Sequence, residues 1–344
     1  MAGPLRLRRS REHWDADRVR RELFGPLDER FGATLADPWF TPEEYESRRL
    51  EMDNGDFALF CWTHEVTAAP DGEPVDGGPD AYWLGNTETP ETLWRTDKYT
   101  FDEAPAAVGE WAENELFARL EVEEPWLARH EHLSRFFLPV LFSKDGRETT
   151  REFFAEHAAG FPDTDRDEAL AYYDAFLATG ALDPHRYTMA AKLGTSQGGD
   201  WFRMAATMSE FTVAKLLTDA GLAFDAEVEL DSGHVLDFRV GDQLVEVTRP
   251  RPPTRRQRAD TAVAAVRQTG KSKNDGQLRA HPGTLLLVDC SSFRDDEWHR
   301  VAGECPRVAH QPTVVFRARP DGRFEGYRVG DCPLDFRNVI DWQK

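Results

Sequence analysis

The chain contains little lysine, little cysteine and no long hydrophobic run. Seven of its 42 basic residues are lysines, and the formal net charge is -20, with an isoelectric point of about 4.9. This composition resembles that of halophilic archaeal proteins, whose dense acidic surface keeps them soluble. Because high salt screens long-range repulsion, the negative net charge does not exclude nucleic acid as a partner.

The cysteine pattern argues against a zinc-binding protein, and the lack of long apolar segments argues against a membrane-spanning or secreted one. Four cysteines, none in a Cys-x-x-Cys pair, do not form a typical zinc motif and are expected to be buried free thiols. No apolar run approaches the roughly 20 residues that span a bilayer, and the charged first residues lack the apolar core of a signal peptide. We therefore expect a soluble cytoplasmic protein with no membrane partner.

A length of 344 residues is enough for two domains. Two strands are predicted at 57–67 and 81–86, and apolar residues recur at helical spacing from about 103 to 179. Residues 1–182 therefore form a mixed N-terminal domain, to which the sequence assigns no function. A cluster of arginines near its start is expected to be a solvated helix start or tail: Arg6, Arg8, Arg9 and Arg11.

The second domain, residues 201–344, follows a predicted linker over 183–200 that contains three glycines. Gly221 is a good C-cap for its first helix, and Thr254 could cap its second. The predicted order is helix, three strands, helix, buried strand, over residues 201–220, 222–230, 235–240, 244–248, about 254–269 and 284–290, with two more strands near the C-terminus. The fold class is therefore α/β (α+β overall), with an αβββαβ core in the second domain.

Three acidic residues of this core carry most of the functional information. Gly241-Asp242 predicts a two-residue hairpin turn, which places Asp237 opposite Glu246 on one face. Like charges in such a position destabilise a hairpin unless a cation lies between them. Glu210 emerges from the apolar side of the first helix. Carboxylate oxygens suit Mg²⁺ or Mn²⁺, so we predict that these three residues hold a divalent metal.

The stretch SEFTVAKLLTDAGLAFDAEVELDSGHVLDFRVGDQLVEVTRP, residues 209–250, resembles the PD-(D/E)xK (restriction-endonuclease-like) nuclease superfamily. With the helix and strand that follow, the resemblance covers about a quarter of the chain and is confined to its C-terminal third. It implies a nuclease-like core that cuts nucleic acid with a divalent metal. Asp237 resembles the aspartate of the motif, Glu246 its second acid, and Glu210 the acid that many members carry on their first core helix.

The chain departs from the motif at two positions. Leu236 replaces the proline, and Thr248 replaces the lysine that is thought to orient the attacking water. Members of the superfamily can relocate this lysine. Lys271 and Lys273, two of only seven lysines, follow the next predicted helix and are the candidates for its role.

The segment from Arg249 to Arg279 is basic within an acidic chain. It contains nine Lys or Arg residues and two acids, a local net charge of +7. Such an excess is the electrostatic signature of phosphate contacts. We predict nucleic-acid contacts, with DNA as the first choice, from Arg249, Arg251, Arg255, Arg256, Arg258 and Arg267. The alternative is a basic face that docks on the acidic N-terminal domain.

The leading prediction is a magnesium-dependent nuclease, with a homodimer left open. Two alternatives remain at this point. A diagonal salt bridge from Arg239 to Glu246 would also explain the acids of the hairpin. The fold could also serve as a catalytically inactive module that binds nucleic acid or protein, which Thr248 in place of lysine favours.

Overall fold

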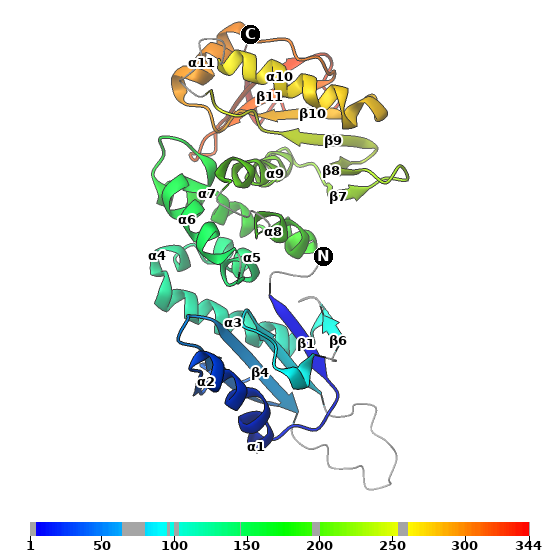
Figure 1. The fold of residues 1–344 in the computed structure, drawn as a ribbon. Helices are drawn as coiled ribbons and strands as arrows, with labels where there is room; N and C mark the ends of the chain where they lie inside the picture. Colours follow the sequence, from blue (N-terminus) through cyan, green and yellow to red (C-terminus); the bar gives the residue numbers. More distant parts are fainter. Residues whose placement is uncertain are drawn as a thin grey trace. The chain divides into compact units, whose positions relative to one another are not determined.

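The computed structural model describes residues 5–63, 80–94, 97–99, 103–144, 146–194, 200–253 and 261–343. The chain divides into two compact units, Met1–Glu148 and Thr149–Lys344 (Figure 1). Each unit contains helices and a sheet of its own, so the predicted α/β class is confirmed. In the described part of the chain, every helix is too short or too polar to cross a membrane.

The N-terminal unit is built on a six-stranded antiparallel sheet in the order β2-β3-β4-β5-β1-β6. Its strands are β1 (Arg6–Ser10), β2 (Thr34–Ala36), β3 (Tyr45–Glu51), β4 (Phe57–Thr63), β5 (Ala81–Gly85) and β6 (Asp97–Tyr99). The two strands predicted from sequence, β4 and β5, are present and paired. Phe60, Trp62 and Trp83 pack in the core beneath the first helices.

The arginine cluster at the start of the chain is a strand, not a helix or tail. β1 lies between β5 and β6, and Leu5 and Leu7 are buried on one side of it. Arg9 forms a bidentate pair with Asp80, with Nη2 2.6 Å from Oδ2. The alternation of leucine with arginine is the two-residue period of a half-buried strand, and the high charge obscured it.

The helices of this unit begin and end as follows: α1 Ala16–Val19, the π-helical turn η1 Arg20–Phe24, α2 Gly25–Phe31, the 3-10 turn η2 Glu91–Leu93, α3 Ala106–Glu123, α4 Pro125–Ala128, α5 Glu131–Leu141 and the first residues of α6 (Arg147–His157). The helical region predicted from about residue 103 therefore spans both units.

The C-terminal unit contains a seven-stranded mixed sheet in the order β13-β12-β11-β10-β9-β8-β7. The strands are β7 (Asp225–Glu229), β8 (Val235–Val240), β9 (Gln243–Thr248), β10 (Leu285–Asp289), β11 (Thr313–Ala318), β12 (Phe324–Val329) and β13 (Ile340–Trp342). The helices are η4 (Ala158–Gly160), α7 (Arg166–Leu177), η5 (Asp183–His185), α8 (Arg186–Gly194), α9 (Trp201–Asp219), α10 (Ala262–Asp275), η6 (Gln277–Ala280) and α11 (Asp295–Glu304).

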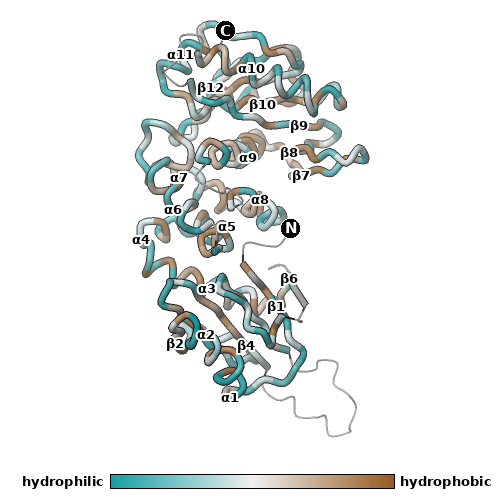
Figure 2. The backbone as a smooth tube through the Cα atoms, in the orientation of Figure 1, coloured by the Kyte–Doolittle hydropathy of each residue, from teal (hydrophilic) through white to brown (hydrophobic). Residues whose placement is uncertain are grey.

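The predicted helix–strand order is observed as α9, β7, β8, β9, α10 and β10. β10 is buried at every residue, because it pairs in parallel with both β9 and β11 and is covered on its faces. α10 packs Val263 and Val266 against Leu286 and Val288 of β10. Figure 2 shows the hydrophobic character of β10 beside the mixed character of α10.

Two boundaries differ from those predicted. The expected linker over 183–200 contains η5 and α8, and the division between the units lies earlier, at Glu148. The three glycines and the single proline of this stretch concealed the helix. α10 begins after Thr261, whose hydroxyl accepts from the N–H of Ala264, and not after Thr254, which lies outside the described residues.

Candidate metal-binding site

The β8–β9 hairpin forms the base of the site. Phe238 pairs with Val245 and Val240 with Gln243, which is the register predicted from sequence. Continued by one residue, this register sets Asp237 opposite Glu246. The ladder ends before that pair, and Asp237 Oδ2 accepts the freed backbone N–H of Val247 at 2.7 Å. The aspartate therefore lies where the two strands part.

Two more carboxylates join Asp237 from neighbouring elements. Glu210 of α9, Glu227 of β7 and Asp237 each place one oxygen within 4.8 Å of the others (all three are partly buried). Sequence reasoning predicted Glu210 and missed Glu227. β7 pairs with β8 on both sides of Glu227, so this residue faces Asp237. Its φ of 56° is uncommon for a residue with a side chain.

Glu227 could not be distinguished in the sequence. The segment DAEVE alternates acidic and apolar residues, so in a strand its three acids lie on the same face. Only the position of β8 beside it selects the middle acid as a partner of Asp237.

A lysine from α8 lies among these three carboxylates. Lys192 Nζ is 2.7 Å from Glu210 Oε2, is also hydrogen-bonded to Glu227, and is 4.0 Å from Asp237 Oδ1. Sequence reasoning missed Lys192 because its segment was assigned to the linker. Its rarity, as one of seven lysines, was the signal that could have found it.

A second lysine contacts the remaining acid. Lys273 of α10 places Nζ 2.5 Å from Glu246 Oε1. Lys271, two residues earlier, is exposed. Arg239, the alternative partner of Glu246, pairs instead with Asp225 across the β7–β8 ladder at 2.9 Å. The structure therefore favours Lys273 over both Lys271 and Arg239 as the cation beside Glu246.

The six side chains form what we call the acidic cluster: Lys192, Glu210, Glu227, Asp237, Glu246 and Lys273. If all are ionised, its four carboxylates and two ammonium groups sum to a formal charge of -2. Burial, together with the negative charge of Asp237, raises the pKa of Glu210 to about 8 and that of Glu246 to about 7. Burial also raises the pKa of Asp237 itself. With every group ionised, the negative charge of the cluster would exceed what the two lysines neutralise, and the raised pKa values show that the acids bind protons in preference to carrying that charge.

The donor set fits a hard divalent cation. Glu210, Glu227 and Asp237 offer three converging oxygen ligands, the kind that Mg²⁺ and Mn²⁺ prefer, and Glu246 lies near Asp237 outside this group of three. Glu246 Oε2 is buried and has no hydrogen-bond partner, while the side chain as a whole is 4% exposed. An unpaired buried carboxylate oxygen is costly, and a metal ion bound there would remove that cost.

One of the predicted phosphate contacts is wrong. The side chain of Arg249 is fully buried and pairs with Asp289, with Nη2 2.6 Å and Nε 3.1 Å from Oδ2. Asp289 Oδ1 accepts the N–H of Ser291. Arg249 therefore links the ends of β9 and β10 and does not face solvent. Of the other predicted contacts, Arg251 and Arg267 are exposed, and Arg255, Arg256 and Arg258 lie outside the described residues.

A model of one protein family matches residues 2–336 of the chain. The chain belongs to DUF5784, a family of unknown function. Comparisons with curated proteins and with solved structures found no match. For this DUF5784 protein, the acidic cluster is therefore the basis for a functional proposal.

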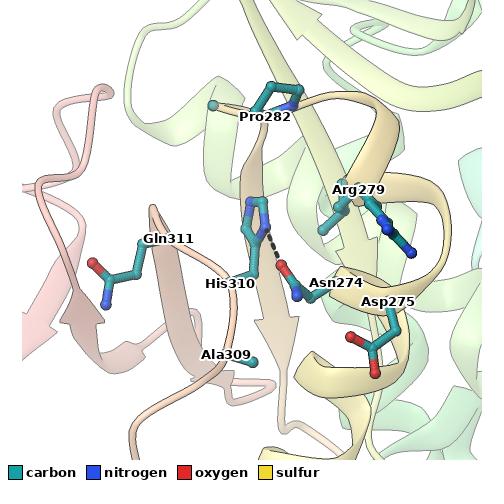
Figure 3. Close-up of a pocket in the computed structure, with 9 residues that line it drawn as sticks. Asn274, Asp275, Arg279, Pro282, Ala309, His310 and Gln311 are labelled. Atoms are coloured by element: carbon teal, nitrogen blue, oxygen red, sulfur yellow. Dashed lines mark hydrogen bonds between the residues drawn. The ribbon is translucent and has the colours of Figure 1, made fainter.

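The DUF5784 chain also has a pocket of about 550 Å³ beside the C-terminal end of α10 (Figure 3). Its wall includes Asn274, Arg279 and His310, and the buried His310 ring lies 2.6 Å from the carbonyl oxygen of Thr284 through Nε2 and 3.4 Å from Asn274 Oδ1 through Nδ1. Within the described chain, its lining includes no member of the acidic cluster. The candidate metal-binding site therefore lies outside this pocket.

Proposed function

We propose that the protein is a cytoplasmic, divalent-metal-dependent phosphodiesterase that acts on nucleic acid, with DNA as the first candidate. The observation that carries the proposal is the convergence of Glu210, Glu227 and Asp237 on an αβββαβ core. Glu246, paired with Lys273, is close enough to Asp237 for the charge of Asp237 to raise its pKa. The resemblance to PD-(D/E)xK nucleases implies metal ligands at Asp237, Glu246 and Glu210. A homodimer stays open.

Glu210, Glu227 and Asp237 would hold Mg²⁺ or Mn²⁺, since their oxygens lie within 4.8 Å of one another, and Glu246 would supply a further oxygen ligand. When bound, such a metal lowers the pKa of a coordinated water and neutralises charge on the phosphate. Asp237 is fixed for this role by the N–H of Val247, which holds Oδ2 and leaves Oδ1 toward Lys192.

Lys273 would take the role of the absent motif lysine. Its ammonium group is held against Glu246 from α10, whereas Thr248 on the strand offers no positive charge. A cation here can orient a water molecule and offset charge on a phosphate. Exposed Arg251 and Arg267, together with Arg255, Arg256 and Arg258, would supply phosphate contacts along the substrate.

A non-catalytic module is the second candidate, and Lys192 is the observation that favours it. Its ammonium group lies among three carboxylates and can neutralise part of their charge without a metal. In that case the cluster is an ion-pair network that stabilises the fold, and nucleic acid or protein binds elsewhere on the domain.

A cleavage assay separates the two candidates. The full chain would be incubated with plasmid and oligonucleotide substrates in Mg²⁺ or Mn²⁺, with EDTA as a blank. The proposal expects metal-dependent cleavage that Asp237→Asn abolishes and Asp225→Asn leaves intact, because Asp225 is an exposed acid of the adjacent strand. Cleavage that persists in Asp237→Asn would disprove the assignment.

A further inference from the structure

A second pocket in the C-terminal unit lies between α6, α9 and the segment after β9. Its volume is about 460 Å³, within the range of ligand-binding pockets. Phe153 and His157 of α6, Trp201 and Phe202 of α9, and Pro252 contribute to its lining. It is separate from the acidic cluster, none of whose members lines it in the described chain.

One wall of this pocket is a preformed aromatic face. The Trp201 ring lies 4.5 Å from His157 between centroids and is parallel to Phe153 within 7° at 6.5 Å. Phe153 is fully buried and fixes the orientation of the indole, while Trp201 and His157 remain partly exposed. A rigid, partly exposed aromatic surface is what a planar heterocycle needs for stacking.

The charges around the pocket are exposed. The guanidinium of Arg251 lies 4.7 Å from the centroid of the lining residue Phe202. Two acids of the lining, Glu156 and Asp163, are exposed, and Asp163 is paired with Arg294 at 3.3 Å. The aromatic wall therefore suits an uncharged ring, and an anion is favoured beside Arg251. A nucleotide has this polarity, since its base carries amino donors and its phosphate carries the negative charge.

Arg251 at the pocket lies only a few residues after Glu246 of the acidic cluster. Arg251 follows Glu246 by five residues, so their Cα atoms are at most roughly 18 Å apart. A strand of nucleic acid that passes the cluster needs only a few nucleotides to reach Arg251.

We propose that the pocket binds one unstacked base of a single-stranded segment of the substrate, which stacks on Trp201 while Arg251 contacts its phosphate. The identification of nucleic acid as the ligand rests on the proposed function. The inference adds that the protein selects single-stranded or locally opened nucleic acid over intact duplex.

The test is a binding titration of the full chain with fluorescent 10-nucleotide single strands in EDTA, so that no cleavage occurs. Trp201→Ala should weaken binding about 5- to 150-fold, the range for loss of one base–aromatic stack. Trp94→Ala is the matched control, since Trp94 is 60% exposed and lies in the other unit. If Trp201→Ala does not fold, Phe202→Leu provides the second variant and should weaken binding in the same direction.

An abasic residue moved along the oligonucleotide identifies the stacked base. One position should weaken binding to the wild type and have little further effect on Trp201→Ala. DNA and RNA versions of the strand determine which sugar is preferred, and a matching duplex should bind less tightly than either. Equal binding by Trp201→Ala, Phe202→Leu and wild type would overturn the inference.

The outcomes separate this inference from the proposed function. If the wild type cleaves nucleic acid and Trp201→Ala has unchanged affinity and KM, the base pocket is wrong and the nuclease remains. If Trp201→Ala loses affinity but the wild type never cleaves with Mg²⁺ or Mn²⁺, the pocket is right and belongs to a non-catalytic binding module.

Discussion

Asp237 accepts the backbone N–H of Val247 through Oδ2 at 2.7 Å, at the point where β8 and β9 separate. Because of this bond, two substitutions of Asp237 should differ in their effect on stability. Asp237→Asn keeps a carbonyl oxygen for Val247 and should unfold at nearly the wild-type denaturant concentration. Asp237→Ala leaves a buried N–H unpaired and should cost about 1–3 kcal/mol. Urea unfolding measures both, and equal stability of the two variants would contradict the structural role of this bond.

Lys273 is expected to act in cleavage and not in metal binding. Lys273→Met removes the cation beside Glu246 and should lower kcat roughly 10²- to 10³-fold, as for loss of one electrostatic catalytic group. Affinity for Mn²⁺ should stay the same or increase, because a competing positive charge is removed. Lys271→Met is the control, since Lys271 is exposed on the same helix. Equal loss in both variants would exclude a specific role for Lys273.

The metal affinity should rise with pH. Binding requires ionised carboxylates, and the pKa values of Glu246 and Glu210 are raised to about 7 and about 8. Affinity for Mn²⁺ should therefore increase about tenfold per pH unit from pH 6 toward 8, where binding displaces one proton. Calorimetry in buffers of different ionisation enthalpy measures the protons released. A pH-independent affinity would contradict the raised pKa values.

The raised pKa values of Glu210 and Glu246 also predict that the stability of the metal-free protein falls as the pH rises. A carboxyl group whose pKa is raised by folding contributes stability that is full below its unfolded pKa of about 4.3 and is lost as pH rises through the folded value. Thermal unfolding in EDTA should therefore show a Tm that falls from about pH 5 to about pH 8 and then levels off. Glu210→Gln should reduce this fall, because it removes the group with a pKa of about 8. An identical pH profile in the variant would refute the assignment.

The buried pair of Arg249 and Asp289 should be essential for stability. Arg249→Met leaves the Asp289 carboxylate buried without its cation and should cost about 3–5 kcal/mol. Arg251→Ala, two residues later and exposed, should change stability by less than about 0.5 kcal/mol. Chemical denaturation of both variants, with Arg249→Met/Asp289→Leu as the compensated pair, tests this contrast. A mild effect of Arg249→Met would show that the pair is not buried as described.

Local patterns predicted most of the C-terminal fold. The end of α9 at Asp219, the hairpin turn at Gly241 and the buried strand β10 each follow from a nearby signal of a few residues. The positions of Asp237 and Glu246 could be predicted because the register of a hairpin depends only on its turn and the residues beside it. The N-terminal strand β1 was missed because its arginines conceal a two-residue period.

The rest of the site depends on contacts between distant segments. Lys192 meets Glu210 across 18 residues and Glu227 across 35, and Arg249 meets Asp289 across 40. A sequence pattern does not encode which charges a fold brings together over such separations. For this reason Arg249 was predicted as a phosphate contact, although its partner makes it a buried structural residue.

The most direct test of the account is isothermal titration calorimetry of Mg²⁺ and Mn²⁺ into the full chain at pH 8 in high potassium chloride. The account predicts binding by the wild type and by Asp225→Asn, and loss of binding in Asp237→Asn. Absence of binding in the wild type, both alone and with an oligonucleotide present to supply phosphate ligands, would contradict a metal site and leave the lysines as the only cations of the cluster.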